Sequence, residues 1–396
     1  MKTFRLILLA TLLAVAPATS RASSTDTVGE GSSDARVPIE IPEHQPVVLE
    51  IERLFRLQDA TAMGVRTSVA DQKEAILTVS EMLRHLPAAP SAQLVYYTVA
   101  YVLSGGDPNS ARWLSEAFGL DTHQRKLLEA SAYFMTGDRE RAGDIFRQIK
   151  LESLPAVLRG RLALALALIE RDSPENHQRY LAKAIASMPG TLIEESSLRR
   201  SALAYAESQD EHLFWDRLHR YERRFRRSIF ASRFREETID ALVVWFSKDK
   251  PPSLLRTDYM LVSLPISERR LSYLYLARRA ALAGEIALTE FAARRLRRIS
   301  AEGSPDDTIA KLYESLFAIV ASGGEIAAEK LNSVERHYLT ESDLILLDAA
   351  LAVEAEINAP LEDSSSLQAN DEQTPLEEQG ARLLNDAASL LQSARL

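Results

Sequence analysis

Hydrophobic residues recur every three or four positions along most of this chain from about Pro46 onward. Three stretches show this spacing clearly: 142–149, 181–188 and 309–320. Such spacing places the apolar side chains along one face of an α-helix. No stretch alternates apolar and polar residues with a period of two. The pattern therefore predicts an all-α protein without a β-sheet.

Short polar or glycine-containing breaks separate these helical runs. Six of them recur, at 104–107, 136–138, 170–172, 208–210, 283–285 and 322–325. Neighbouring breaks lie about 32 to 40 residues apart, except across one wide gap from Asp210 to Gly284, and this spacing is typical of helix–turn–helix arrays. The repeats do not follow the tetratricopeptide consensus residue by residue. We therefore expect a tetratricopeptide-like α-solenoid of stacked helical hairpins, each stabilised by packing on its neighbours.

The wide gap contains prolines that interrupt the helical period and suggest a joint between two helical layers. We assign 44–246 to an N-terminal α-solenoid, 247–266 to the joint and 267–358 to a C-terminal helical layer. Residues 359–396 are rich in acids and predict a disordered tail. Within that tail, 379–394 has the pattern of a short terminal helix.

The first residues resemble a secretory signal peptide. Residues 1–22 combine a basic start, an apolar run at 6–16 and an A-x-A cleavage site at 16–18, with a second candidate site at 20–22. The apolar run is well short of the ~20 residues that span a bilayer, although an uncleaved anchor is the alternative. Residues 23–43 are polar and predict a flexible linker. We therefore expect export to the periplasm and no transmembrane segment in the mature protein.

Composition narrows the classes of function. The chain has no cysteine, which excludes thiol nucleophiles, disulfides and thiolate metal sites. With 46% hydrophobic and 26% charged residues it has the composition of a globular protein. The net charge of −9 falls to −11 when a cut after Ala18 removes the two basic leader residues. Export and net acidity both argue against nucleic acid as a partner.

Two clusters are candidates for a chemical site. His212, Asp216 and His219 share one helix face, but the histidines are about 10.5 Å apart along the axis, too far for one metal ion. Glu195-Ser196 resembles the Glu-Ser pair of lytic transglycosylases, but it falls in the first turn of a helix, where acids favour the macrodipole. We therefore expect no catalytic residue, no cofactor and no metal site.

The densest positive charge lies between Arg217 and Arg235, where aromatic residues are interleaved with arginines. Arginine and aromatic side chains are enriched in protein interfaces. An acidic protein surface, anionic lipid headgroups or peptidoglycan carboxylates would be suitable partners. The alternative is that these arginines pair internally with acids such as Glu236 and Glu237, or cover the joint. The predicted partner-binding residues are Arg220, Tyr221, Arg223, Arg224, Phe225, Arg226 and Arg227.

A second basic cluster comprises Arg278-Arg279 and the run 294–298. Each part lies beside an apolar stripe, so a solvated helix face is the favoured interpretation. The acidic tail folding back onto these arginines is the alternative.

The segment Met188 to Arg200 reads MPGTLIEESSLRR. Pro189-Gly190 ends one helix, and Thr191 with Glu194 predicts a capping box that begins the next. The sequence PGTLIEESSLRR resembles the matching segment of the MotC family. The leader, the helical body and the apolar stretch 161–169 resemble that family as well.

This resemblance implies a periplasmic accessory of the flagellar motor that is required for flagellar rotation. It further implies contact with the periplasmic part of the stator protein MotB, without catalysis. The alternative is a periplasmic α-solenoid adaptor for cell-envelope or cell-wall assembly. An enzyme or a two-lobed solute-binding protein is the third class, and it would require a catalytic pair or a sheet domain that the pattern does not predict.

Overall fold

The computed structural model describes residues 44–66, 69–321 and 324–358. The predicted leader, linker and acidic tail lie outside these residues. Within them every regular element is helical and no strand occurs, which confirms the all-α prediction. None of the described helices is long and apolar enough to cross a bilayer.

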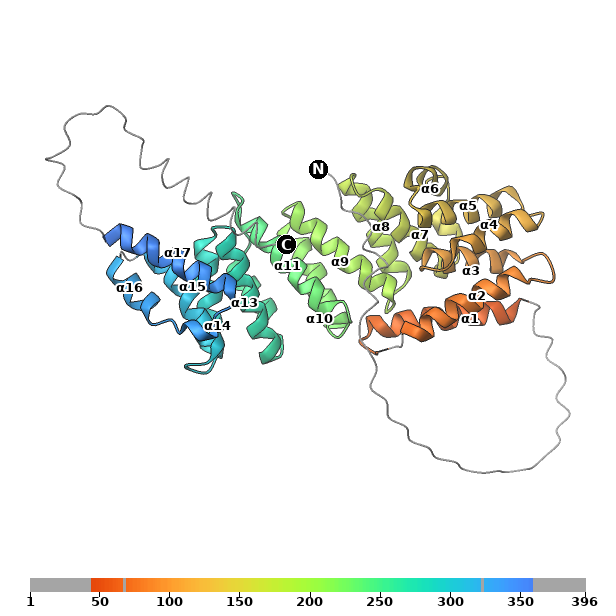
Figure 1. The fold of residues 1–396 in the computed structure, drawn as a ribbon. Helices are drawn as coiled ribbons and strands as arrows, with labels where there is room; N and C mark the ends of the chain where they lie inside the picture. Colours follow the sequence, from red (N-terminus) through yellow and green to blue (C-terminus); the bar gives the residue numbers. More distant parts are fainter. Residues whose placement is uncertain (1–43, 67–68, 322–323, 359–396) are drawn as a thin grey trace, which may run out of the picture. The chain divides into compact units, whose positions relative to one another are not determined.

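The described residues divide into two compact units (Figure 1). The first comprises residues 44–205 and 212–231, and the second comprises 206–211 and 232–358. The helices of the first unit are α1 (Gln45–Ala62), α2 (Val69–Arg84), α3 (Ala92–Leu103), α4 (Pro108–Ala117), α5 (Thr122–Thr136), α6 (Arg139–Phe146), the 3₁₀ helix η1 (Leu151–Ser153), α7 (Ala156–Ile169), α8 (Pro174–Ser187), α9 (Leu192–Glu207) and α10 (Glu211–Phe225). Those of the second are α11 (Ala231–Phe246), α12 (Leu254–Val262), α13 (Ile266–Leu282), α14 (Ile286–Ile299), α15 (Pro305–Ala321), α16 (Gly324–Asn332), the 3₁₀ helix η2 (Arg336–Tyr338) and α17 (Glu341–Asn358).

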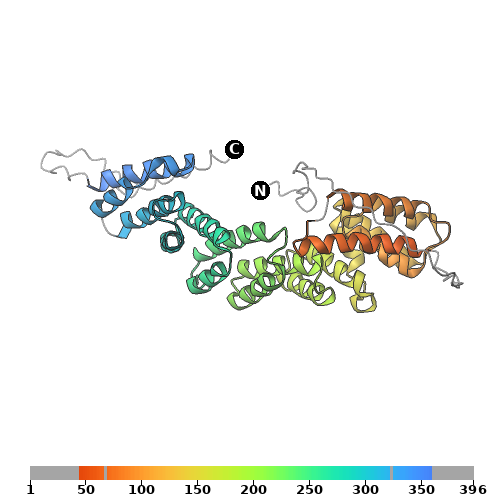
Figure 2. The same cartoon turned by 90° about the horizontal axis from the view of Figure 1, so that it is seen from below.

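Many of the helices that follow one another along the chain pack against one another. In the first unit α1 packs on α2, α4 on α5, and α7 on α8. In the second unit each helix from α13 to α16 packs on the helix that follows it (Figure 2). This pairwise packing of neighbours is the arrangement expected of a helical-hairpin solenoid and confirms that prediction.

Local sequence signals explain where the helices begin and end. Asp121 and Gln124 form a capping box at the start of α5, and Gly137 ends the same helix with a φ of 94°. Asp107 caps α4 through the backbone N–H of Asn109, ahead of Pro108. Five of the six predicted breaks fall between consecutive helices, and the sixth, 322–325, is only partly described.

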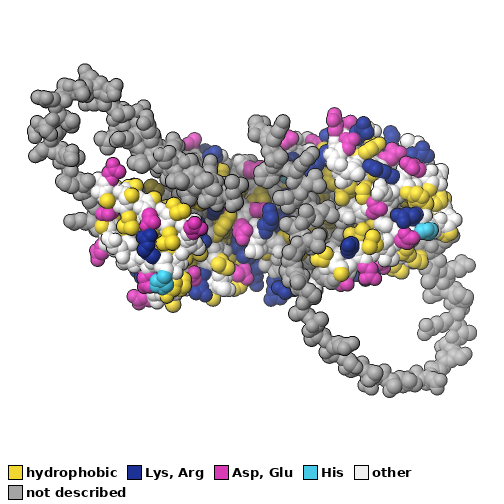
Figure 3. All heavy atoms as spheres, in the orientation of Figure 1, with side chains coloured by type: hydrophobic (Ala, Val, Ile, Leu, Met, Phe, Trp, Pro, Cys, Tyr) yellow, Lys and Arg dark blue, Asp and Glu magenta, His cyan; other side chains and the backbone are white. Residues whose placement is uncertain are grey.

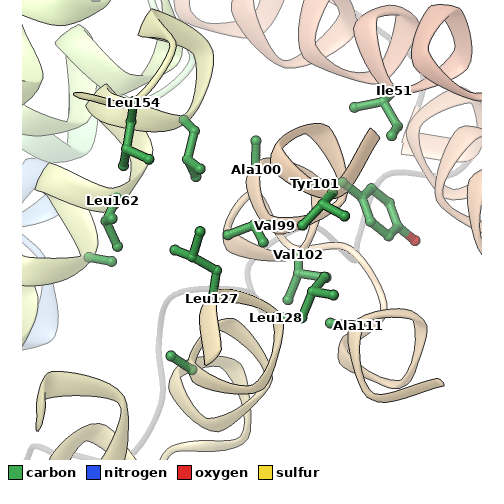
Figure 4. Packing of buried hydrophobic residues seen from close by; sticks show 14 of the residues in the cluster. Ile51, Val99, Ala100, Tyr101, Val102, Ala111, Leu127, Leu128, Leu154 and Leu162 are labelled. Carbon is green, nitrogen blue, oxygen red and sulfur yellow. The ribbon is translucent and has the colours of Figure 1, made fainter. Parts of the chain in front are cut away.

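One large hydrophobic cluster stabilises the first unit. It joins α1, α3, α4, α5 and α7 through buried side chains such as Ile51, Val99, Leu127 and Leu162 (Figure 4). Tyr101 lies within it, and its hydroxyl group donates to the carbonyl oxygen of Ile76 at 3.0 Å. Burial of this apolar surface is the main favourable term in the stability of the unit.

A separate cluster stabilises the end of the second unit. Leu312 on α15, Leu331 on α16 and Leu347 on α17 meet there, with Val334 and Ala350. The helix α12 lies within the segment 247–266 that the sequence indicated as a joint.

Candidate partner-binding surface

The helix α9 begins where the sequence predicts, but its first turn is stabilised differently. Glu194 does reach back, since its Oε2 accepts the backbone N–H of Gly190 at 2.7 Å. Thr191 does not complete the capping box, because its hydroxyl group donates to the carbonyl oxygen of Met188 at 2.7 Å. The first N–H of the helix, from Leu192, instead donates to Asp59 of α1 at 2.8 Å. The start of α9 is therefore held by α1 as well as by its own cap.

Two adjacent carboxylates lie completely buried in this first turn. Glu194 and Glu195 are both 0% exposed. Glu194 accepts hydrogen bonds from Arg220 of α10, at 3.1 Å from Nε and 2.5 Å from Nη2. The Nη2 atom of Arg224, one turn further along α10, lies 3.3 Å from the other oxygen of Glu194. A buried carboxylate is tolerated only when cations and hydrogen-bond donors surround it in this way.

Glu195 binds a different set of donors. Arg199, one turn along α9, donates from Nε at 2.9 Å and from Nη2 at 3.1 Å. The Tyr221 hydroxyl group of α10 donates at 2.9 Å, and that of Ser228, just after α10, at 3.2 Å. Burial, and then the charge of Glu195, raise the pKa of Tyr221 above its usual range. The two carboxylates thus fasten α9 to α10 and to the turn that follows it.

This geometry bears on the Glu195-Ser196 pair. A general acid must reach the substrate proton that it transfers, directly or through one water. The carboxylate of Glu195 is closed off from solvent and already accepts from Arg199, Tyr221 and Ser228. Its role in this structure is therefore to hold helices together.

The seven predicted interface residues divide into an inward and an outward group. Tyr221 and Phe225 are buried in the core, and Arg220 and Arg224 are directed to Glu194. The outward group is Arg223, Arg226 and Arg227, which are exposed and form no ion pair with a described residue, whereas Arg224 is exposed but paired with Glu194. Lys and Arg side chains are interspersed with Asp and Glu side chains over the face of the protein shown in Figure 3.

Internal pairing of the arginines between Arg217 and Arg235 does occur, with Glu237 as the sequence indicated and also with Glu194. Glu237 pairs with Arg233 of its own helix at 3.0 Å, whereas Arg220 and Arg224 pair with Glu194. The sequence indicated Glu194 as a capping residue and Glu195 as a first-turn acid, but it did not predict that both carboxylates are buried and bonded to α10. The available signal was their position on the helix directly before the arginines of α10, because consecutive helices of such an array pack together.

The histidine cluster shows no sign of a metal site. His212, Asp216 and His219 are exposed, and Asp216 forms an ion pair with Arg217 at 2.5 Å. Among the described residues no group of three His, Asp or Glu side chains could hold a metal ion.

The second basic cluster is largely neutralised by acids of neighbouring helices. Arg278 pairs with Asp343 at 2.6 Å, Arg279 with Asp240 at 2.6 Å and Arg295 with Asp258 at 2.8 Å. Arg294 and Arg297 also have carboxylate partners. These pairs belong to the packing of the second unit. The alternative, a contact of these arginines with the acidic tail, involves residues outside the described part of the chain.

Comparison with known proteins gives two matches. The family model described as chemotaxis protein MotC matches residues 1–394. The chain is also 28% identical over 324 residues to the chemotaxis protein MotC of Rhizobium meliloti (strain 1021). This alignment covers 79% of this chain and 73% of that protein. No solved structure matches this chain.

Proposed function

Because the chain belongs to the MotC family of chemotaxis proteins, we propose that it is a non-enzymatic accessory of the flagellar motor, acting in the periplasm. The match over residues 1–394 is the observation that carries this proposal. The pattern of a signal peptide at 1–22 supports the location. The enclosure of Glu195 by four donor groups of Arg199, Tyr221 and Ser228 supports a role without catalysis.

The proposed mode of action is protein contact with the periplasmic part of the stator protein MotB. A helical-hairpin solenoid offers a large surface for such a contact. Within the predicted segment Arg220–Arg227, the exposed groups Arg223, Arg226 and Arg227 would make the contact. Arg220, Tyr221 and Phe225 would support it from below, and Arg224 is exposed but paired with Glu194.

The experiment that tests the function is an in-frame deletion in the native host. Flagellar filaments are counted by electron microscopy, and swimming is measured by cell tracking. Cells that carry normal filaments but swim slowly or not at all would support a role in rotation. Normal swimming would contradict it, and misshapen or bald cells would favour the alternative of an envelope-assembly adaptor.

The location and the absence of catalysis have separate tests. Fractionation should recover the chain, shortened by its leader, with the periplasmic proteins. Incubation of the purified chain with peptidoglycan should release no muropeptides. Release of muropeptides that Glu195→Gln abolished would contradict the non-enzymatic role.

A further inference from the structure

Two turns that are far apart in the sequence form one continuous surface in the first unit. The turn after α1 touches the turn after α10, because the backbone N–H of Ile229 donates to the carbonyl oxygen of Thr61 at 3.3 Å. Gly64, with a φ of 82°, approaches so closely that a Cβ atom there would lie 2.1 Å from the carbonyl oxygen of Arg227. The end of α1 accordingly lies beside the α10–α11 turn (Figures 1 and 2).

We call this surface the turn patch, and it is both basic and apolar. Its apolar side chains are Met63, Val65 and Ile229, which are 51%, 56% and 46% exposed. Its cations are Arg66, Arg223, Arg226 and Arg227, all exposed. Neither turn, 60–66 or 223–230, contains an acid.

The four arginines of the turn patch form no ion pair with a described carboxylate, whereas most other described arginines do. The second basic cluster, by contrast, is paired almost throughout. Four like charges on one surface repel one another, and an acidic partner would relieve that repulsion.

The buried carboxylates hold the turn patch in position from beneath. Glu195 accepts from Ser228 at 3.2 Å, and the same Ser228 oxygen accepts the backbone N–H of Phe230 at 3.2 Å. Arg199, which also binds Glu195, lies 5.0 Å from the centre of the Phe230 ring. The α10–α11 turn is therefore fixed before any partner binds, which lowers the entropic cost of association.

We propose that the turn patch is a docking surface for an acidic protein segment that also carries apolar side chains. Guanidinium groups bind carboxylates with two parallel hydrogen bonds, and every cation of the patch is an arginine. Exposed methionine, valine and isoleucine supply the apolar contact that a protein segment would bury. This inference rests on the proposed function in so far as the segment belongs to the stator protein.

A protein segment fits the patch better than a membrane surface does. A helix that adsorbs to lipid inserts its apolar face between the headgroups. The apolar face of α10, which includes Phe214, Leu218, Tyr221 and Phe225, is buried in the protein. Three separate apolar side chains on two turns do not replace that face.

The test compares two charge reversals that change the net charge equally. Arg66→Glu, Arg226→Glu and Arg227→Glu alter the turn patch. The control changes Arg139, Arg171 and Arg298 to Glu, which are exposed and form no ion pair with a described residue. Binding of the full chain to the purified periplasmic part of MotB is measured by titration calorimetry. The patch variant should bind at least about tenfold more weakly, and the control within about twofold of the parent.

Two further measurements make the outcome decisive. Circular dichroism shows whether each variant is folded, and Met63→Gln tests the apolar contribution without changing charge. Equal losses in the patch variant and the control would overturn the proposal, because the effect would then be one of overall charge. Binding to vesicles of phosphatidylglycerol that the patch reversal alone abolished would assign the patch to a membrane instead.

The identity of the partner and the role of the turn patch as a docking surface can be tested separately. If the parent chain does not bind the MotB fragment, a photo-reactive side chain placed at position 63 in living cells identifies what the patch contacts. A crosslink to an acidic segment of another protein, lost in the patch variant, would keep the docking surface and contradict the stator partner. Paralysed deletion cells with no patch-dependent crosslink would keep the motor function and overturn the docking surface.

Discussion

Glu195 is the residue whose removal should cost the most stability in the first unit. In Glu195→Gln the charge that faces Arg199 is lost, and the buried donors from Tyr221 and Ser228 face a weaker acceptor. We expect the free energy of unfolding to fall by about 3 kcal/mol, as for other broken buried ion pairs. Urea unfolding followed by circular dichroism measures it.

The matched control is Glu237→Gln. Glu237 pairs with Arg233 at 3.0 Å, also across one helical turn, but the Arg233 side chain is 61% and the Glu237 side chain 37% exposed. An exposed pair of this kind contributes less than about 1 kcal/mol. Equal losses in the two variants would show that burial of Glu195 does not matter.

Tyr97 gives the protein a pH dependence on the alkaline side. Burial, and then the hydrogen bond that its hydroxyl group donates to Glu52, raise the pKa of Tyr97 to about 12. The folded state therefore holds this proton more tightly than the unfolded state, whose tyrosine has a pKa near 10. The stabilisation is complete below about pH 10 and is lost as the pH rises through 12.

In Tyr97→Phe the ionisable group is absent. The variant should therefore lose less stability than the parent between about pH 10 and pH 12, which urea midpoints at several pH values would show. Identical slopes in the two proteins would contradict the assignment. Tyr275, whose pKa is also raised to about 12, by burial and then by Asp240, remains in both and cancels in the comparison.

At the scale of elements, the contact between the α1–α2 turn and the α10–α11 turn depends on Gly64. Alanine there would combine a φ of 82° with a Cβ atom 2.1 Å from the carbonyl oxygen of Arg227. The two turns would have to separate. We expect Gly64→Ala to lower the free energy of unfolding by about 3 kcal/mol, from the unfavourable φ and the displaced contact together.

Gly137→Ala separates these two causes. Gly137 has a φ of 94°, but an added Cβ atom would meet nothing within 4 Å. Only the cost of the left-handed conformation, about 1 kcal/mol, remains. A loss for Gly64→Ala no larger than this control would mean that the turns are not tightly packed.

The sequence could predict most of the helices, but only part of the contacts between them. The positions of the helices followed from the apolar period and the caps, as for α5 between Asp121 and Gly137. The period of α10 also places Phe214, Leu218, Tyr221 and Phe225 on one face, so the burial of the two aromatic residues named as interface was predictable. The contact of Gly64 with Arg227 was not, because it joins segments far apart in the chain, and the choice of Arg220 and Arg224 as partners of Glu194 depends on how α9 packs on α10.

At the scale of the whole molecule, each of the two units contains a hydrophobic cluster of its own. In an array of helical hairpins each part is stabilised by its own interior and by its nearest neighbours. A single all-or-none transition is therefore not expected of this chain. Urea should unfold the two units at different concentrations.

Two substitutions can assign those transitions. Asp343 is the counterpart of Glu195 in the second unit, being 2% exposed and bonded to Arg278 at 2.6 Å and to the Tyr313 hydroxyl group at 2.9 Å. Asp343→Asn should lower the urea midpoint of one transition and Glu195→Gln that of the other, because each lowers the free energy of unfolding of its own unit by about 3 kcal/mol. Circular dichroism follows both units. If both substitutions moved one common transition by equal amounts, the units would unfold together, and a partner bound to the turn patch would stabilise the entire chain.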